Sequence, residues 1–477
     1  MSPVLVAVIT LALAVPDHSL GYFPGLSRDK AQQVSVGPSS GPVFLIVVDA
    51  LRPDRLDAYG FGRETAPRLS ALADEGFIFT NFYANGNWTR PSTATILTGL
   101  LPHEHGVEGQ GDRLSDDIES FPERLMKHGV PTGAVIGNGN AGRAFGLGRG
   151  FSFYADTVDH WKGLPSAEDV IQTGMPFVKQ HAGSPFFMML FMVDPHDPYH
   201  APGEFENFFV EDKSVRLIRT PHWEVGTYSP PEIERMKATY DGAVRYTDTQ
   251  LGKFFDELKR LGIYEDSTII VTADHGEAFG EHGYFLHSHH LYDEIVRVPL
   301  IVKLPKASGT GTYVPSLHDT SDLAPTILTQ LNVPVGTEGS GVDLVARLVN
   351  PKLNDPDRHI VTAFNHFGIR RWAVRTYHRK VIFHERADET EFRATVGRPS
   401  LLPSVSFDRE SLLFFDLQSD PFEEKDLFAR AGTHKAGWLK LLEVIQNRNA
   451  RPAMGQVRTG ELDPETKRDL QALGYID

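Results

Sequence analysis

The sequence has no cysteine among its 477 residues. This absence excludes disulfide bonds, thiolate metal sites and cysteine nucleophiles, and it excludes any cofactor made by oxidising a cysteine. Basic side chains are also scarce, because 47 Lys and Arg residues stand against 62 Asp and Glu residues and give a formal net charge of −15. We therefore expect no nucleic acid partner, and an anionic ligand would have to be held by a local site.

Long apolar runs are absent as well, so we expect no stable membrane span. An apolar run at residues 4–15 has the length of a signal-peptide core, and the small residues at 12–14 resemble a cleavage pattern. No Lys or Arg precedes Arg28, so the positive segment is reduced to the terminal amine. We expect residues 1–20 to be a signal peptide and the chain to be periplasmic or secreted, with a cytoplasmic location as the alternative.

The remaining composition is that of a folded globular protein, with 41% hydrophobic and 23% charged residues. Three apolar runs at residues 43–48, 186–193 and 268–272 predict strands that are buried on both faces. Helical patterns alternate with them at residues 65–75, 91–98 and 231–261. This alternation predicts an α/β fold with a large doubly wound mixed sheet flanked by helices, over residues 21–349.

The C-terminal part has a different pattern. Short strands are predicted at residues 359–363, 371–376, 380–384 and 412–417, and helices near residues 435–447 and 464–473. We expect residues 350–477 to form a smaller antiparallel α+β lobe.

Polar side chains follow each of the three buried runs. Asp49 ends the first, Asp194 and His196 follow the second, and Asp274 and His275 follow the third. In open α/β sheets, ligands bind beyond the carboxyl ends of the strands. These residues are therefore candidates for one common site.

Thr89 lies at the start of another candidate segment, residues 87–99. Pro91 near the beginning and Gly99 at the end predict a short helix with Thr89 at its N-terminus. The threonine is either a simple helix cap or a nucleophile whose oxygen is activated by the helix dipole and a nearby cation. Taken alone, the segment favours the cap.

Seven segments together resemble the sulfatase and alkaline phosphatase superfamily, in the family's order along the chain. They are VVDALRPDRLDAYG (47–60), TRPSTATILTGLLPHEHGV (89–107), YDGAVRYTDTQLGKFFDELKRLG (240–262), TADHGEAFGEHGYFLHSHHLYDEIVRVPLIV (272–302), DLAPTIL (322–328), FFDLQSDPFEEKDL (414–427) and LQALGYID (470–477). The resemblance implies that Asp49, Asp274 and His275 bind a divalent metal ion such as Mn, Zn, Ca or Mg. It also implies that Thr89 is the nucleophile and a further metal ligand.

The sequence departs from the sulfatases proper at several of their functional positions. Thr89 stands where they carry the residue that becomes formylglycine, and Thr93 stands where they carry an Arg. Asn138 and Asn140 replace a Lys and a His, and Ala50 replaces an Asp that binds calcium. The pattern is more similar to relatives with a threonine nucleophile, namely phosphodiesterases, phosphonate monoester hydrolases and phosphoryl transferases.

His196 and His287 are further catalytic candidates, either as proton donors to the leaving group or as ligands of a second metal. Additional candidates for a second site are Asp194, Asp197, His200, His289 and His290. We interpret the glycine-rich residues 137–142 as a flexible loop, and Glu423 with its acidic neighbours as a solvated turn.

The leading hypothesis is a metal-dependent hydrolase of phosphate or phosphonate esters that acts through Thr89, or a transferase that passes the phosphoryl group to an alcohol. The alternatives are a sulfatase that works without formylglycine and a non-catalytic metal-binding relative. The expected partner is an anionic ester, either a small molecule or one linked to a glycan or lipid, and the oligomeric state is left open.

Overall fold

The computed structural model describes residues 9–10, 33–34, 41–157, 164–219, 228–336, 339–366, 369–384, 411–428, 441 and 443–444. The apolar N-terminal run lies outside these residues except for β1 (Ile9–Thr10), which pairs with β2 (Gln33–Val34). The C-terminal helices predicted near residues 435–447 and 464–473 also lie outside them, apart from three positions. Within the described residues, no helix combines the length and the apolar composition that a membrane span needs.

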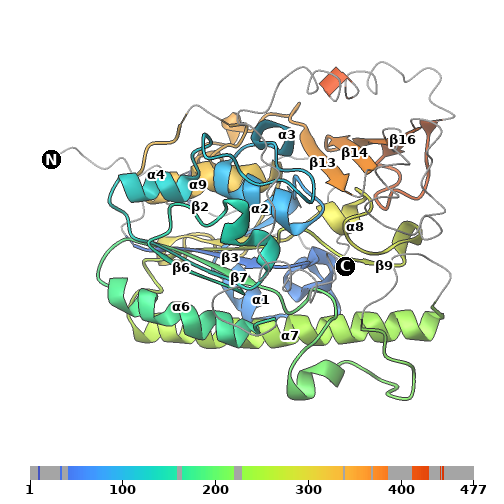
Figure 1. Ribbon diagram of the computed structural model, residues 1–477, viewed down its shortest axis with the longest axis horizontal. Helices are drawn as coiled ribbons and strands as arrows, with labels where there is room; N and C mark the ends of the chain where they lie inside the picture. Colours follow the sequence, from blue (N-terminus) through green and yellow to red (C-terminus); the bar gives the residue numbers. More distant parts are fainter. Residues whose placement is uncertain are drawn as a thin grey trace.

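An eight-stranded mixed sheet forms the centre of the molecule (Figure 1). Its spatial order is β12-β4-β11-β8-β3-β7-β5-β6, and only β11 runs antiparallel to its neighbours. The strands are β3 (Val43–Val48), β4 (Phe77–Tyr83), β5 (Thr132–Ile136), β6 (Phe153–Asp156), β7 (Phe187–Met192), β8 (Thr268–Thr272), β11 (Leu300–Lys303) and β12 (Thr312–Asp319). The three apolar runs predicted as strands are β3, β7 and β8, and every residue of each is buried.

Helices cover both faces of this sheet, which confirms the predicted fold class. On one face lie α1 (Pro67–Asp74), α6 (Ala167–His181) and α7 (Pro230–Arg260), with α6 and α7 side by side below the sheet in Figure 1. On the other lie α2 (Thr89–Thr98), α4 (Phe121–Lys127) and α9 (Leu323–Gln330). Shorter elements are α3 (Pro102–His105), α8 (Asp293–Val296), α10 (Leu344–Val349) and the β9 (Ala278–Phe279) and β10 (Phe285–Leu286) pair.

A separate four-stranded antiparallel sheet follows in the C-terminal part, as predicted. Its strands, in spatial order, are β13 (Ile360–His366), β14 (Ile369–Arg375), β15 (Arg379–His384) and β16 (Ser411–Asp416). One bridge between Gly86 and Ala363 joins it to the segment before α2. The second sheet therefore lies close to the start of the helix that carries Thr89.

Two buried polar networks connect this second sheet to the main domain. In the first, Asp293 forms ion pairs with Arg375 (2.7 Å) and Lys380 (2.8 Å), and Lys380 also forms an ion pair with Glu423 at 2.7 Å. Glu423 is only 2% exposed, so its interpretation as part of a solvated turn is wrong. The turn packs against α8, and Glu423 accepts the backbone N–H of Asp293 at 2.7 Å.

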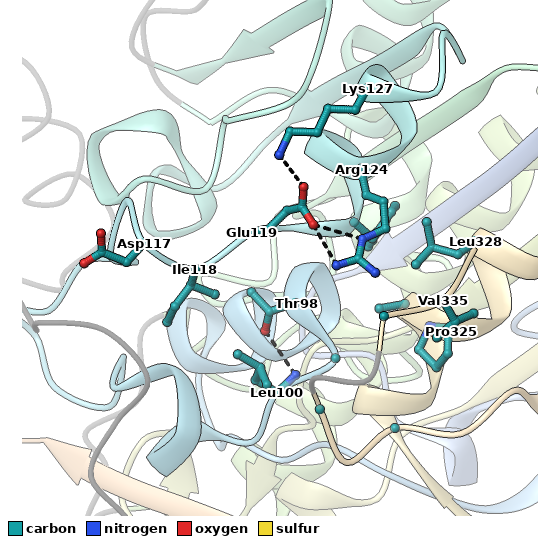
Figure 2. A pocket seen from close by; sticks show the side chains of 16 residues that line it. Thr98, Leu100, Asp117, Ile118, Glu119, Arg124, Lys127, Pro325, Leu328 and Val335 are labelled. Carbon is teal, nitrogen blue, oxygen red and sulfur yellow. Dashed lines mark hydrogen bonds and ion pairs between the residues drawn. The ribbon is translucent and has the colours of Figure 1, made fainter. Parts of the chain in front are cut away.

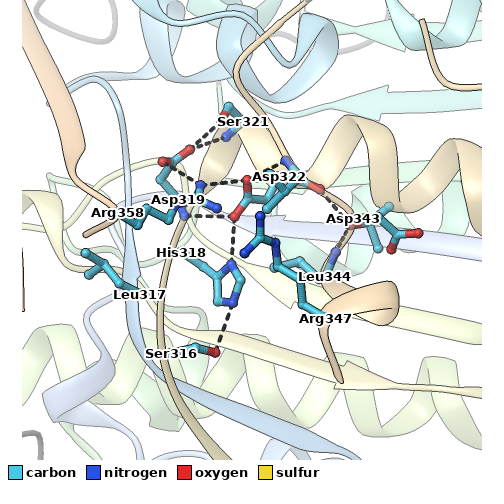
Figure 3. A network of polar contacts seen from close by, with 12 residues as sticks. Ser316, Leu317, His318, Asp319, Ser321, Asp322, Asp343, Leu344, Arg347 and Arg358 are labelled. Atoms are coloured by element: carbon cyan, nitrogen blue, oxygen red, sulfur yellow. Dashed lines mark hydrogen bonds and ion pairs between the residues drawn. The ribbon is translucent and has the colours of Figure 1, made fainter. Parts of the chain in front are cut away.

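The second network lies where β12 leads into α9 (Figure 3). Arg358, just before β13, donates to Asp319 at 3.1 Å and to Asp322 at 2.8 Å. Asp322 also contacts His318 Nδ1 at 2.8 Å and accepts the backbone N–H of Val342 at 2.8 Å. A single guanidinium thus holds the end of β12, the start of α9 and the entry to β13 together.

Candidate metal and nucleophile site

The candidate site lies at the carboxyl ends of neighbouring strands. Asp49 directly follows β3, Asp274 and His275 come after β8, and His196 comes after β7. Thr89 enters from α2, which begins shortly after β4. The parallel direction of β3, β7 and β8 brings these side chains to one edge of the sheet, where α/β folds bind their ligands.

Thr89 is the first residue of α2 and is not its cap. The cap position is Trp88, which has an extended backbone and makes no capping hydrogen bond with its side chain. The Thr89 hydroxyl is fully buried and lies 3.4 Å from His275 Nε2. It therefore faces the predicted metal ligands instead of closing the end of its own helix.

The three predicted metal ligands converge in the structure. His275 Nδ1 donates to the carbonyl oxygen of Gly276 at 2.9 Å, which leaves Nε2 as the acceptor nitrogen. That Nε2 lies 3.3 Å from Asp49 Oδ1 and 3.4 Å from Asp274 Oδ2. One imidazole nitrogen and two carboxylate oxygens thus point toward a common position.

These residues fit a divalent metal ion. Within the described part of the chain, Asp49 Oδ1 and Asp274 Oδ2 are buried without a hydrogen-bond donor. Burial, with the neighbouring Asp49 charge, raises the pKa of Asp274 to about 7, and burial also raises the pKa of Asp49. Two such carboxylates are costly to bury unless a cation compensates them, and an oxygen and imidazole donor set suits Mn, Zn and related ions.

A second group of side chains adjoins the first. His196, Asp197 and His287 bring their ligating atoms within 4.8 Å of one another. The ring of His287 lies 4.7 Å from that of His196 and 4.2 Å from that of His275, centroid to centroid. The two candidate histidines therefore lie beside the predicted metal ligands, as one continuous site.

A carboxylate holds His287 in place, and a backbone carbonyl oxygen holds His196. His287 Nδ1 lies 3.1 Å from Glu277 Oε1, and His196 Nδ1 lies 2.7 Å from the carbonyl oxygen of Asp197. Burial lowers the pKa of His196, but the charges of Asp49, Asp197 and Glu277 outweigh burial and raise it to about 9. Because Nδ1 of each histidine is engaged in this way, Nε2 is the nitrogen that can bind a metal or contact a substrate.

Glu277 is a site residue that the motifs of the sequence did not indicate. It is fully buried, and burial raises its pKa well above the usual value. Its position three residues after Asp274 is the one signal that could have indicated it.

Four of the further candidates have other partners. Burial raises the pKa of Asp194 to about 8, and this carboxyl lies near the backbone of Ala167 at the start of α6. The side chain of His200 is 64% exposed and lies 3.6 Å from Glu206. His290 lies 3.7 Å from Glu294, and the carbonyl oxygen of His289 accepts from Arg371. Of the additional candidates, only Asp197 joins the site.

Asn138 is the second residue that was missed as part of the site. It is fully buried, and its Nδ2 donates to Asp49 Oδ2 at 2.7 Å and to Thr89 Oγ1 at 3.2 Å. The segment that carries it is a buried turn with a short 3-10 helix at Gly139–Ala141, so the interpretation as a flexible loop is wrong. Asn138 follows β5 at the same sheet edge, which is the signal that could have indicated it.

A separate cavity of about 400 Å³ lies at the other end of α2, between α4 and α9 (Figure 2). Thr98 and Gly99 line it, together with Arg124 and Lys127, which both pair with Glu119. Thr98 lies nine positions after Thr89 in the same helix, which corresponds to about 14 Å along the axis. This cavity is therefore distinct from the candidate site.

Comparisons with known proteins identify the family and the fold of the chain. A family model described as Sulfatase matches residues 42–333. N-acetylglucosamine-6-O-sulfatase of Bacteroides thetaiotaomicron is 22% identical over 496 aligned positions, which cover 82% of this chain and 83% of that protein.

Solved structures show the same fold over nearly their whole length. The phosphonate monoester hydrolase of Agrobacterium radiobacter superposes with a TM-score of 0.68 at 19% identity, covering 89% of this chain and 98% of that one. The protein BT4656, solved in complex with its substrate D-glucosamine-2-N,6-O-disulfate, superposes with a TM-score of 0.67 at 20% identity, covering 86% and 98%.

Proposed function

Because the chain belongs to the sulfatase family, we propose that it is a metal-dependent hydrolase that cleaves phosphate or phosphonate esters, diesters included, with Thr89 as its nucleophile. One observation carries the proposal. The single hydroxyl of Thr89 lies among the predicted metal ligands, 3.4 Å from His275 Nε2 and 3.2 Å from Asn138 Nδ2. The metal would be held by Asp49, Asp274 and His275, with Thr89 as a fourth ligand.

The proposed reaction proceeds in two displacements. Thr89 Oγ1 loses its proton to solvent and attacks phosphorus, so that a new O–P bond forms and the bond between phosphorus and the leaving oxygen breaks. His196 or His287 donates a proton to that oxygen. Water then attacks the phosphothreonine in line and restores the threonine hydroxyl, while attack by an alcohol would instead complete a transfer. A bound divalent metal supplies charge neutralisation for the phosphoryl oxygens.

The single hydroxyl of Thr89 also favours phosphate over sulfate. A formylglycine hydrate carries two hydroxyls on one carbon, so after one is sulfated the other can expel sulfate by collapse to the aldehyde. Threonine has one hydroxyl, and a sulfated Thr89 could be cleared only by attack of water on sulfur. The neutral side chains at Thr93, Asn138 and Asn140 also remove the cationic partners that sulfatases place around sulfate.

A sulfatase without formylglycine is the second candidate, and the likeness to a glycan sulfatase favours it. Under either candidate, the substrate would be an anionic ester on a small molecule, a glycan or a lipid. His196, Asp197 and His287 provide a donor set for a second metal as an alternative to proton transfer.

The apolar run at residues 4–15 supports export of the chain to the periplasm or beyond the cell.

The test compares kcat/KM for matched nitrophenyl phosphate monoesters, diesters, phosphonates and sulfates in the presence of Mn, Zn, Mg or Ca. We expect the phosphorus esters to be turned over fastest. Thr89→Ala should abolish turnover, and Asp274→Asn should lose bound metal and turnover together while the fold persists. Thr98→Ala, at the other end of the same helix, is the matched control and should keep full activity.

A preference for sulfate that disappears in Thr89→Ala would overturn the choice of ester and favour the second candidate. Unchanged metal content in Asp274→Asn, measured by elemental analysis, would contradict the ligand assignment. A wild-type protein that binds metal but turns over none of the esters would favour the non-catalytic relative.

A further inference from the structure

We propose that Asn138 is a positioning residue. The two N–H groups of its side-chain amide hold the nucleophile Thr89 and the metal ligand Asp49 in fixed positions relative to each other. The inference rests on the proposed function for the role of Thr89. The Nδ2 atom of Asn138 lies 2.7 Å from Asp49 Oδ2 and 3.2 Å from Thr89 Oγ1. All three residues are fully buried, so water does not replace these bonds.

The orientation of the amide is set by its own turn. Asn138 Oδ1 accepts the backbone N–H of Asn140 at 2.9 Å, and it caps the 3-10 helix Gly139–Ala141. A flipped amide would place Nδ2 against that N–H and Oδ1 against the carboxylate of Asp49, so both contacts would become repulsive. The amide must therefore present its two donors to Asp49 and Thr89.

The turn that carries Asn138 is also bonded to the helix that carries the nucleophile. Asn140 Oδ1 accepts from Arg90 Nη2 at 2.7 Å, and Arg90 is the residue directly after Thr89. The Arg90 guanidinium also lies over the ring of Phe145, 3.3 Å from its centroid. The contacts close a ring from Thr89 to Arg90, Asn140, Asn138 and back to Thr89, which joins α2 to the end of β5.

This ring has two consequences for the site. The bond from Asn138 satisfies Asp49 Oδ2 and turns the other oxygen, Oδ1, toward His275 Nε2 at 3.3 Å. The bond to Thr89 Oγ1 occupies one lone pair of the hydroxyl and limits its rotation, and it would stabilise negative charge on that oxygen during attack. A neutral amide can do both, whereas a carboxylate at position 138 would repel Asp49.

The experiment measures metal binding and turnover separately in Asn138→Ala and in Asn138→Asp, which keeps the shape and removes the donors. Titration of the EDTA-dialysed protein with Mn²⁺ should show an affinity weakened about 10- to 100-fold in Asn138→Ala, as for other residues that support metal ligands. On the best ester of the wild type, kcat should fall about 100-fold or more, with little change in KM. Asn138→Asp should also lose kcat, even if its carboxylate retains the metal.

Asn81→Ala is the matched control. Asn81 is a buried asparagine on β4, and its Nδ2 donates a hydrogen bond to the carbonyl oxygen of Pro315 at 2.9 Å. It should leave both the Mn²⁺ affinity and kcat near wild type. Unchanged Mn²⁺ affinity and kcat in folded Asn138→Ala would overturn the inference, and so would equal losses in Asn81→Ala. The Mn²⁺ titration needs no turnover and the kinetics use whichever ester the wild type cleaves, so a wrong ester class contradicts only the proposed function.

Discussion

At the scale of single residues, the buried polar side chains around α2 serve different purposes. Thr89, at the start of the helix, faces the candidate site, while Thr95, farther along, supports the local fold. His105 Nδ1 accepts the backbone N–H of Val107 at 3.0 Å, so its Nε2 carries the proton and faces Thr95 Oγ1 at 3.1 Å. This histidine is 1% exposed, and burial, with the nearby charge of His103, lowers its pKa to about 3.

The lowered pKa of His105 predicts a loss of stability in weak acid. Below about pH 6.5, the unfolded chain binds a proton on this histidine and the folded chain does not. The stability that the neutral, buried imidazole contributes is therefore complete above that pH and is lost as the pH falls toward 3. Between pH 7.5 and 5, the wild type should lose about 2 kcal/mol more unfolding free energy than His105→Gln. Urea unfolding at both pH values measures the difference, and parallel losses in the two proteins would contradict the assignment.

Among the elements, the connection between β12 and α9 depends on charged side chains that are largely buried. Figure 3 shows Arg358 reaching Asp319 and Asp322 from the segment before β13. Burial raises the pKa of Asp319, whereas for Asp322 the Arg358 charge and the His318 bond outweigh burial and lower it. The ion pairs therefore hold a strand end, a helix start and a second sheet in one arrangement.

Removal of this guanidinium should be costly. Arg358→Ala leaves two buried carboxylates without their counter-charge, and we expect a loss of about 3–5 kcal/mol in unfolding free energy. Arg347→Ala is the matched control, because Arg347 lies nearby in Figure 3 and donates to the carbonyl oxygen of Leu353 without an ion pair among the contacts described. Chemical denaturation of the three proteins is the measurement, and equal losses in both variants would show that the ion pairs are not the cause.

At the scale of the whole molecule, the antiparallel sheet is anchored to the main domain by the ion network of Asp293. Arg375 comes from β14, Lys380 from β15 and Glu423 from the turn after β16, and all converge on α8. The charges of Arg375 and Lys380 outweigh burial and lower the pKa of Asp293, so the carboxylate is charged at neutral pH.

Asp293→Asn should loosen the second sheet before the first. The substitution leaves Arg375 and Lys380 without their shared carboxylate, and amide hydrogen exchange should accelerate in β15 and β16 while β3 stays protected. Glu424→Gln is the control, because Glu424 is an exposed neighbour of the buried Glu423 and should change stability by less than about 0.5 kcal/mol. Exchange in β15 and β16 that matches the wild type would show that the sheet is anchored by other contacts.

The local patterns of the sequence determined three strands of the main sheet, β3, β7 and β8, and the polar residues that follow them. A short run rich in β-branched and apolar residues, with an acidic residue one or two positions after it, predicts β3 and β8, because a strand buried on both faces has few polar positions. The same logic located Asp49, Asp274 and His275 together with His196 beyond β7, because carboxyl ends of parallel strands share one edge.

The packing of distant segments determines which other polar groups reach that edge. Asn138 contacts Asp49 across 89 positions of sequence because β5 pairs with β7, and no local pattern reveals that order. Glu423 is buried because a turn packs on α8, although its acidic neighbours give the segment the composition of an exposed loop. Periodicity records which face of an element is buried, whereas the partner of a buried polar atom depends on strand order and packing between distant segments.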